Sequence, residues 1–266
     1  MPLSINTNIA SMTAQRSFLN SNSSLEQAFE RLSTGKRVNS AVDDAAGLAI
    51  GKDLESRVSG LNQAVRNVND GISMVQILEG AYDEVTTIVQ RMRDLAVQAA
   101  NESLTSTERA YLDSEQAKLV TALDSVMDQA KFGNVDLATG STVNVTIHSG
   151  AEAADTITLA MTTSSNDNAD ALSIDATDVN LTTTAGATSA IGDLDTALNT
   201  IATQRATLGA QQSQLESVVR NLANVAENTA AAAGRIMDTD YAAETANPTK
   251  AQILQQAATS ILAQAN

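Results

Sequence analysis

Few residues in this sequence have the types and the spacing that catalysis or metal binding needs. The chain contains one histidine, His148, and no cysteine, so His148 has no second imidazole or thiolate within ligand spacing. A His-Glu-x-x-His zinc protease site is therefore excluded. The adjacent carboxylates of Asp43 and Asp44 suggest a hydrolytic or metal-binding pair, but acids also stabilise the first turn of a helix. We interpret His148 as a surface residue and the two acids as a helix start.

Glycine and hydroxyl residues provide no catalytic set either. Gly71 follows Asn69 and Asp70, which is a hairpin-turn signal in isolation. Its position inside a heptad pattern instead favours a glycine that allows close helix packing. The sequence holds no glycine-rich phosphate loop and no set of Ser, His and Asp, so it predicts neither an enzyme nor a bound cofactor.

The composition argues against several classes of binding protein. There are 31 Asp and Glu against 16 Lys and Arg, and the net charge of -15 disfavours nucleic acid, whose phosphates are bound chiefly by clustered Arg and Lys. No segment approaches the roughly 18 apolar residues of a membrane span. The helices predicted below carry no basic face for a membrane surface. Residues 1–10 have neither a charged n-region nor an apolar h-region, so no cleavable secretory signal is expected.

The strongest periodic signal is a heptad pattern that follows Asp44. Apolar residues alternate steps of four and three, which is typical of a helix packed along one seam. The pattern loses phase near Gly80 and then resumes, so we predict one helix from about Asp44 to about Ala100, roughly 80 to 90 Å long at 1.5 Å per residue. A helix of this length must pack against others. Its predicted core residues are Leu54, Val58, Leu61, Val65, Val68 and Ile72.

Two further helices are predicted downstream. Thr105 and Glu108 form a T-x-x-E capping box that starts a helix of about 25 residues, which should fold back antiparallel to the first. A long C-terminal helix repeats the spacing of three and four. Arg205 and Gln212 interrupt its seam, where polar residues usually fix register. Its predicted core residues are Leu198, Ile201, Leu208, Leu215 and Leu222.

The middle of the chain differs in charge from the rest. Between Phe132 and Gln204 there are nine acids and no Lys or Arg, so this segment is expected to face solvent. Alternating apolar residues over 143–147 and 157–159 predict two strands that form a hairpin around Gly150.

The two ends of the chain are rich in Ser, Asn, Ala, Gln and Thr, and their apolar residues are sparse. Segments of this kind are expected to be disordered alone and to become helical when a partner covers the apolar positions. The residues predicted to make that interface are Ile5, Ile9, Leu19, Phe29, Leu32, Ile253, Leu254, Ile261 and Leu262.

Long runs on both sides of the chain resemble bacterial flagellin. On the N-terminal side they are Ser4-Ile-Asn-Thr-Asn8, Glu30-Arg-Leu-Ser-Thr-Gly-Lys-Arg-Val-Asn-Ser40, Asp43-Asp-Ala-Ala-Gly-Leu-Ala-Ile50 and Gln90-Arg-Met-Arg-Asp-Leu-Ala-Val-Gln98. On the C-terminal side they are Gln204-Arg-Ala-Thr-Leu-Gly-Ala210, Asn221-Leu-Ala-Asn-Val-Ala-Glu-Asn228 and Ala251-Gln-Ile-Leu-Gln-Gln256. Runs of this length in this order are more specific than a short catalytic motif.

The resemblance implies a mainly α fold: a long antiparallel helical bundle or coiled coil with the N- and C-terminal helices paired, plus a small β-hairpin region in the middle. It implies inner terminal helices at 1–42 and 238–266, which are disordered in the monomer and form the filament core. A helical bundle at 43–137 and 190–237 and a short variable outward insert at 138–189 complete the implied organisation. Pro248 is expected to break the C-terminal segment, because proline suits the first position of a helix.

The implied function is that of a structural subunit that self-assembles into the bacterial flagellar filament for motility. Such a chain is exported unfolded through the flagellar type III apparatus without a cleavable signal and resides in the extracellular filament. The nearest alternative is a hook-filament junction protein, which resembles flagellin at both ends. The implied partners are other copies of the chain, an export chaperone, and the cap and junction proteins, with no nucleic acid and no membrane insertion.

The resemblance also implies recognition by an animal Toll-like receptor, whose epitope in the family lies around residues 90–98. Arg91, Leu95 and Gln98 are four and three residues apart and are expected to share one helical face, with Leu95 exposed beside the Arg91 guanidinium. Lys118 stands on the neighbouring helix where recognised flagellins often carry an acid. Weak to moderate recognition is therefore expected.

Overall fold

The structure is a computed structural model that describes residues 9–138, 143–161, 172, 174 and 179–265. The chain divides into two compact units: unit 1 contains Met1–Ser59 and Ala226–Asn266, and unit 2 contains Gly60–Val225. Two long helices, α2 (Ala45–Ala99) and α5 (Thr184–Met237), contribute residues to both units.

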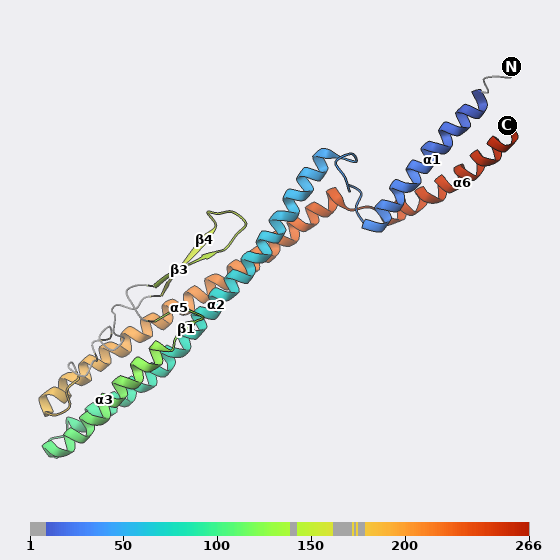
Figure 1. Ribbon diagram of the computed structural model, residues 1–266. Coiled ribbons are helices and arrows are strands. Elements are labelled where there is room, and N and C mark those ends of the chain that lie inside the picture. Colours follow the sequence, from blue (N-terminus) through green and yellow to red (C-terminus); the bar gives the residue numbers. More distant parts are fainter. Residues whose placement is uncertain (1–8, 139–142, 162–171, 173, 175–178, 266) are drawn as a thin grey trace. The chain divides into compact units, whose positions relative to one another are not determined.

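Unit 1 contains a pair of terminal helices, α1 (Ile9–Thr34) and α6 (Tyr241–Ala265). They lie side by side and run antiparallel, as Figure 1 shows. The buried residues recur at heptad-related intervals, with Ala14 and Ala28 on α1 and Ala251 and Ala258 on α6. Because these side chains are small, the contact removes little apolar surface from water per residue.

Pro248 does not break α6, so the predicted break is wrong. The helix is continuous from Tyr241 to Ala265, with Pro248 inside it. A proline in a helix interior removes one backbone hydrogen bond and crowds the carbonyl four residues earlier, which costs about 3 kcal/mol. Pro248 is buried on the same stripe as Ala251 and Ala258. Burial of the pyrrolidine ring in this contact offsets part of that cost and keeps the helix continuous.

The segment after α1 is tied to the turn between α5 and α6. Gly35 has a φ of 71°, the left-handed conformation that ends helices. Its carbonyl accepts a hydrogen bond from the Thr239 backbone N–H at 3.1 Å, and the Arg37 N–H donates to the Met237 carbonyl at 2.6 Å. Backbone hydrogen bonds therefore join the segment that follows α1 to the segment that precedes α6.

Unit 2 contains segments of α2 and α5 together with the helix α3 (Ser106–Asp128). The capping box predicted at its start is confirmed: the Glu108 N–H donates to Thr105 Oγ1 at 3.3 Å, and the Thr105 N–H donates to Glu108 Oε2 at 2.7 Å. The bounds of α2 agree with the predicted long helix to within one residue at each end. α3 folds back along α2, as predicted (Figure 1).

Ion pairs join the three helices of unit 2. Arg91 of α2 pairs with Glu115 of α3 at 2.7 Å, and Arg93 of α2 pairs with Asp195 of α5 at 2.6 Å. Arg205, one of the two polar interruptions of the α5 seam, pairs with Glu79 and Asp83 of α2. All these groups are substantially exposed, so the pairs help to fix alignment and add little stability.

The apolar core of unit 2 follows a heptad seam without a break. Of the predicted core residues in unit 2, the structure buries Leu61, Val68, Ile201, Leu208, Leu215 and Leu222 and leaves Val65, Ile72 and Leu198 half-buried. Leu54 and Val58, which belong to unit 1, are also half-buried. The stripe on α2 passes through Ala64 and Gly71, one residue before Val65 and Ile72. The predicted loss of phase near Gly80 is wrong, because Leu78 and Tyr82 on either side are 1% and 4% exposed.

Two antiparallel strand pairs complete the described part of unit 2. The predicted hairpin is confirmed: β3 (Val143–His148) pairs with β4 (Thr156–Met161), with Ile147 opposite Ile157 and Val145 opposite Leu159. A second pair, β1 (Lys131–Phe132) and β2 (Val135–Asp136), was not predicted. The predicted fold class, mainly α with a small central β-hairpin region, is confirmed.

Candidate assembly surfaces

The predicted interface residues of the terminal helices lie mostly outside the α1–α6 contact. The exposed fractions are 71% for Ile9, 67% for Leu19 and 52% for Phe29 on α1, and 62% for Ile253 and 50% for Leu254 on α6. Leu32 is half-buried. Ile5 lies outside the described residues. Ile261 and Leu262 belong to α6, but the structure does not describe their side chains. Large apolar side chains in such numbers on a helix pair are typical of a surface that a partner covers.

Exposed residues on α1 form a second heptad pattern beside the buried one. We name as the outward stripe the residues that alternate steps of three and four on the exposed side of α1. They are Ile9, Met12, Arg16, Leu19, Ser23 and Glu26. The large apolar residues of the stripe lie toward the start of the helix, with Arg16 among them, and the acid Glu26 lies at its end. The stripe lies on the side of α1 opposite to the buried Ala14 and Ala28.

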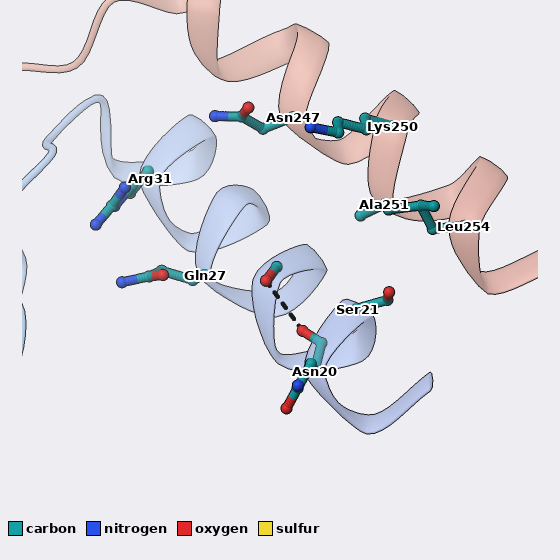
Figure 2. A pocket seen from close by; sticks show the side chains of 9 residues that line it. Asn20, Ser21, Gln27, Arg31, Asn247, Lys250, Ala251 and Leu254 are labelled. Atoms are coloured by element: carbon teal, nitrogen blue, oxygen red, sulfur yellow. Dashed lines mark hydrogen bonds between the residues drawn. The ribbon is translucent and has the colours of Figure 1, made fainter. Parts of the chain in front are cut away.

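A groove runs between α1 and α6 along one side of the pair. Its first part, of about 390 Å³, is shown in Figure 2, where α1 contributes Asn20, Gln27 and Arg31 and α6 contributes Lys250 and Leu254. Its second part, of about 520 Å³, shares the lining residues Asn20, Ser21 and Leu254 and continues to Thr13, Ala14, Ser17, Ala257 and Ala258. We name the two parts together the α1–α6 groove. It is lined by small and hydroxyl side chains at one end and by cations at the other.

Asp43 organises the connection between α1 and α2. Its carboxylate accepts hydrogen bonds from the Gln27 side-chain amide at 2.8 Å, from the Ser40 N–H and hydroxyl at 3.0 Å each, and from the Asn39 N–H at 3.2 Å. The hydrogen bond from Gln27 contributes most, followed by those from Ser40, and together they lower the pKa of Asp43 from 3.8 to about 2. At the predicted helix start, Asp44 caps α2 by accepting a hydrogen bond from the Gly47 N–H at 2.9 Å, and Asp43 ties that start to α1 through Gln27.

Replacing Asp43 by asparagine should lower the melting temperature at neutral pH. A carboxyl group with a depressed folded-state pKa adds stability above its unfolded pKa, and that stability is lost as the pH falls. The difference between the two proteins should therefore close between about pH 4 and pH 2. Thermal melting followed by circular dichroism at several pH values measures this. Asp53→Asn, which removes an exposed carboxylate of α2, should change little, and a difference for Asp43→Asn that stays constant down to pH 2 would contradict the assignment.

One face of the β3–β4 hairpin is packed against the helices of unit 2. Ile147 and Leu159 are 6% and 1% exposed. A β-carbon at Gly71 of α2 would overlap Ile147 Cδ1 and would lie 3.5 Å from Leu159 Cδ1. The Asn67 side-chain amide donates to the His148 carbonyl at 3.3 Å, and Gln211 of α5 donates to the Ala160 carbonyl at 3.1 Å. Gly71 therefore serves hairpin packing, a partner that the sequence pattern did not identify.

The four receptor candidates are not on one exposed surface. Arg91, Gln98 and Lys118 are exposed, and Arg91 is paired with Glu115. Leu95 is 1% exposed, so its predicted place as an exposed apolar contact is wrong. The reason is that α2 is covered on two sides at this level, by α3 and by α5, and Leu95 faces into that contact. Of the four candidates, the three polar side chains are the ones that a receptor could reach on this surface.

The described residues contain no group of His, Asp and Glu side chains placed to hold a metal ion. His148 is exposed at the end of β3. Among the described helices, none combines the length and the apolarity that crossing a membrane requires. The features that stand out are therefore long paired helices and uncovered apolar side chains, which define the class of helical structural proteins that assemble with partners.

Comparison with known proteins identifies the family within this class. The model of the bacterial flagellin N-terminal helical region matches residues 5–137, and that of the C-terminal helical region matches residues 191–266. Polar flagellin F of Vibrio parahaemolyticus is 34% identical over 365 aligned positions, which cover 100% of this chain and 97% of that protein. A flagellin of Halalkalibacterium halodurans is 40% identical over 263 positions, covering 98% and 95%.

A solved structure shares the fold. It is described as a putative flagellar hook-associated protein from Vibrio parahaemolyticus and has a TM-score of 0.59, with 15% identity over 74% of this chain and 100% of that one. Identity this low supports the fold alone. With two family models over most of its length, the chain belongs to the bacterial flagellins. It is a structural subunit of the extracellular flagellar filament, which serves motility.

Proposed function

We propose that this chain is exported unfolded through the flagellar type III apparatus and adds to a growing filament, where its terminal helices form the inner layer. The observation that carries the proposal is the set of large apolar side chains left uncovered on α1 and α6, from Ile9 to Leu254. The sequence contains no Cys and six Phe, Trp and Tyr in total, so an unfolded chain has no disulfide to break and few bulky side chains to pass through a channel.

The family and the packing support the proposed organisation of the chain. Residues 1–42 and 238–266 are the inner terminal helices, residues 43–137 and 190–237 are the bundle, and residues 138–189 are the outward insert. In support, the two family models leave 138–190 unmatched, and the contact between α1 and α6 buries mainly alanine side chains. Such a contact offsets little of the ordering cost of about 1–2 kcal/mol per residue.

Hydrogen exchange tests the proposal. In the monomer, the amides of α1 and α6 should exchange far faster than those of α3, because the terminal pair buries too little apolar surface to stay ordered alone. In filaments assembled from the same protein, both terminal helices should become protected. The capped helix α3 is the internal control, protected in both samples. Equal protection of α1, α3 and α6 in a sample shown to be monomeric would contradict the proposal.

The alternative is a hook-filament junction protein, and a putative hook-associated protein shares the fold of this chain. Identities of 34% and 40% with flagellins against 15% with that structure favour the filament subunit. Purified protein added to filament seeds distinguishes the two functions. A filament subunit elongates the seeds into long filaments, and a junction protein ends growth after a short addition.

Membership in the flagellin family supports a proposal for the partners. We propose that they comprise further copies of the chain, an export chaperone, the cap complex and the junction proteins. We also propose an animal Toll-like receptor as a partner. Its contact would lie on the exposed polar residues Arg91, Gln98 and Lys118, and monomer should signal more strongly than filament because assembly covers this face.

A further inference from the structure

We propose that the outward stripe of α1 in one copy docks into the α1–α6 groove of a neighbouring copy, with Glu26 of the stripe facing Lys250 of the groove. This inference rests on the proposed function, since it specifies the contact by which assembled copies hold one another. Both surfaces lie within unit 1 and are uncovered in the single chain.

The two surfaces match in chemistry and in direction. The stripe begins with Ile9 and Met12, continues through Arg16 to Leu19, and ends with Glu26, its one acid. The groove is lined near the start of α1 by small and hydroxyl side chains such as Ala14 and Ser17, and near the end of α1 by Arg31 and Lys250. Apolar side chains therefore meet the weakly polar part, and the acid meets the cations, when two copies lie parallel and similarly placed along the helix axis.

Among the described residues, the charged groups without an ion pair indicate which two residues face each other across the contact. Lys250 is the one cationic residue of α6, it is exposed, and in the part of the chain that the structure describes it has no ion pair. Arg31 already lies 3.8 Å from both Asp43 and Glu244. On the stripe, the Glu26 carboxylate accepts one bond, from the Asn22 amide of its own helix. Lys250 and Glu26 are therefore the groups of opposite charge still available to a second copy.

The geometry also agrees with an open polymer. The stripe lies on the far side of α1 from α6, whereas the groove lies on the flank between the helices, so the contact joins two different surfaces of identical chains. Contacts of this heterologous kind do not close on themselves as a twofold contact does, and they can repeat along a helical array. A twofold dimer would bury the stripe of each copy and end growth.

Disulfide trapping tests the contact directly, and the chain is suited to it because it contains no Cys. Two single-cysteine proteins, Glu26→Cys and Lys250→Cys, are mixed, assembled into filaments and oxidised. Covalent dimers should form between the two proteins in filaments and not in unassembled protein. Gln252→Cys, two residues along α6 and on its other side, is the matched control and should give no dimer with Glu26→Cys. Filaments without the Glu26 to Lys250 dimer, or with equal yields for both positions, would overturn the proposal.

Charge exchange provides the functional readout. Lys250→Glu should slow seeded elongation by about tenfold or more, because two carboxylates would then face each other across the contact. Lys250→Arg should elongate normally, and the double variant Lys250→Glu with Glu26→Lys should regain most of the rate. Failure of the double variant to recover would overturn the pairing. If the unmodified protein forms no filaments at all, the proposed function fails; if it forms them but both tests are negative, this contact alone is wrong.

Discussion

Replacing Gly71 by leucine should destabilise the chain by about 1–3 kcal/mol, the range typical of overpacking a filled core. Gly71 is buried, and any side chain added there enters the space held by Ile147 and Leu159 of the hairpin. The hairpin would have to lift from α2, which also breaks the hydrogen bond from Asn67 to the His148 carbonyl. Urea unfolding measured by circular dichroism gives the change in free energy.

Gly80 offers a matched control on the same helix. A β-carbon there meets no other atom within 4 Å, so Gly80→Leu should be neutral or should stabilise by about 0.5–1 kcal/mol through helix propensity. A compensating change also tests the contact. Ile147→Ala vacates the volume that a leucine at 71 needs, so the double variant should be less destabilised than the sum of the single variants. Equal effects of leucine at 71 and at 80 would show that the hairpin is not packed as described.

The long helices could be predicted because their apolar residues repeat over many turns. The capping box at Thr105 and the strand alternation on either side of Gly150 were similarly local signals, and both are confirmed. β1 and β2 were missed although Gly133-Asn134 is a two-residue hairpin signal between Phe132 and Val135. Two-residue strands give no period that a pattern search can detect.

The details of packing could not be read from the pattern. Ala64 and Gly71 lie at the centre of the α2 stripe, yet a search for large apolar residues chooses Val65 and Ile72 beside them. The small residues are there because the hairpin comes close, which is a long-range contact without a local signal. Pro248 was misjudged for a related reason, since helix rules describe an isolated helix and α6 is packed along α1.

The interface on the terminal helices stays a prediction, but the exposure of its apolar residues agrees with it. The contact between α1 and α6 does not bury all the apolar side chains of these two helices. Ile9, Leu19 and Ile253 are among those left exposed. Sequence alone could not show that α1 carries two separate heptad patterns, because assigning each residue to a face requires knowing where α6 lies. The groove and the free Lys250 likewise depend on the pairing of segments more than 200 positions apart.

Arg91→Ala should reduce receptor signalling with little loss of stability, whereas Leu95→Ala should reduce stability and leave signalling almost unchanged. Leu95 is 1% exposed, so truncating it leaves a cavity and should cost about 2–5 kcal/mol of stability. Arg91 forms one exposed ion pair, with Glu115, so its loss should cost about 0–1 kcal/mol. If the polar side chains make the receptor contact, Arg91→Ala should reduce the reporter-cell response to monomer by about tenfold or more, as loss of a hot-spot arginine does. Leu95→Ala should signal almost normally at a temperature where it is still folded.

The matched control for this comparison is Arg66→Ala, which removes an exposed arginine of α2 that donates hydrogen bonds to Gln63 and lies far along the helix from Arg91. It should alter neither stability nor signalling. Melting curves recorded on the same preparations separate loss of contact from loss of folding. An Arg91→Ala monomer with full response, or a folded Leu95→Ala monomer with none, would place the receptor contact elsewhere. The second result would also mean that Leu95 becomes exposed when the receptor binds, which requires α3 or α5 to move away from α2 and to break the Arg91–Glu115 or the Arg93–Asp195 pair.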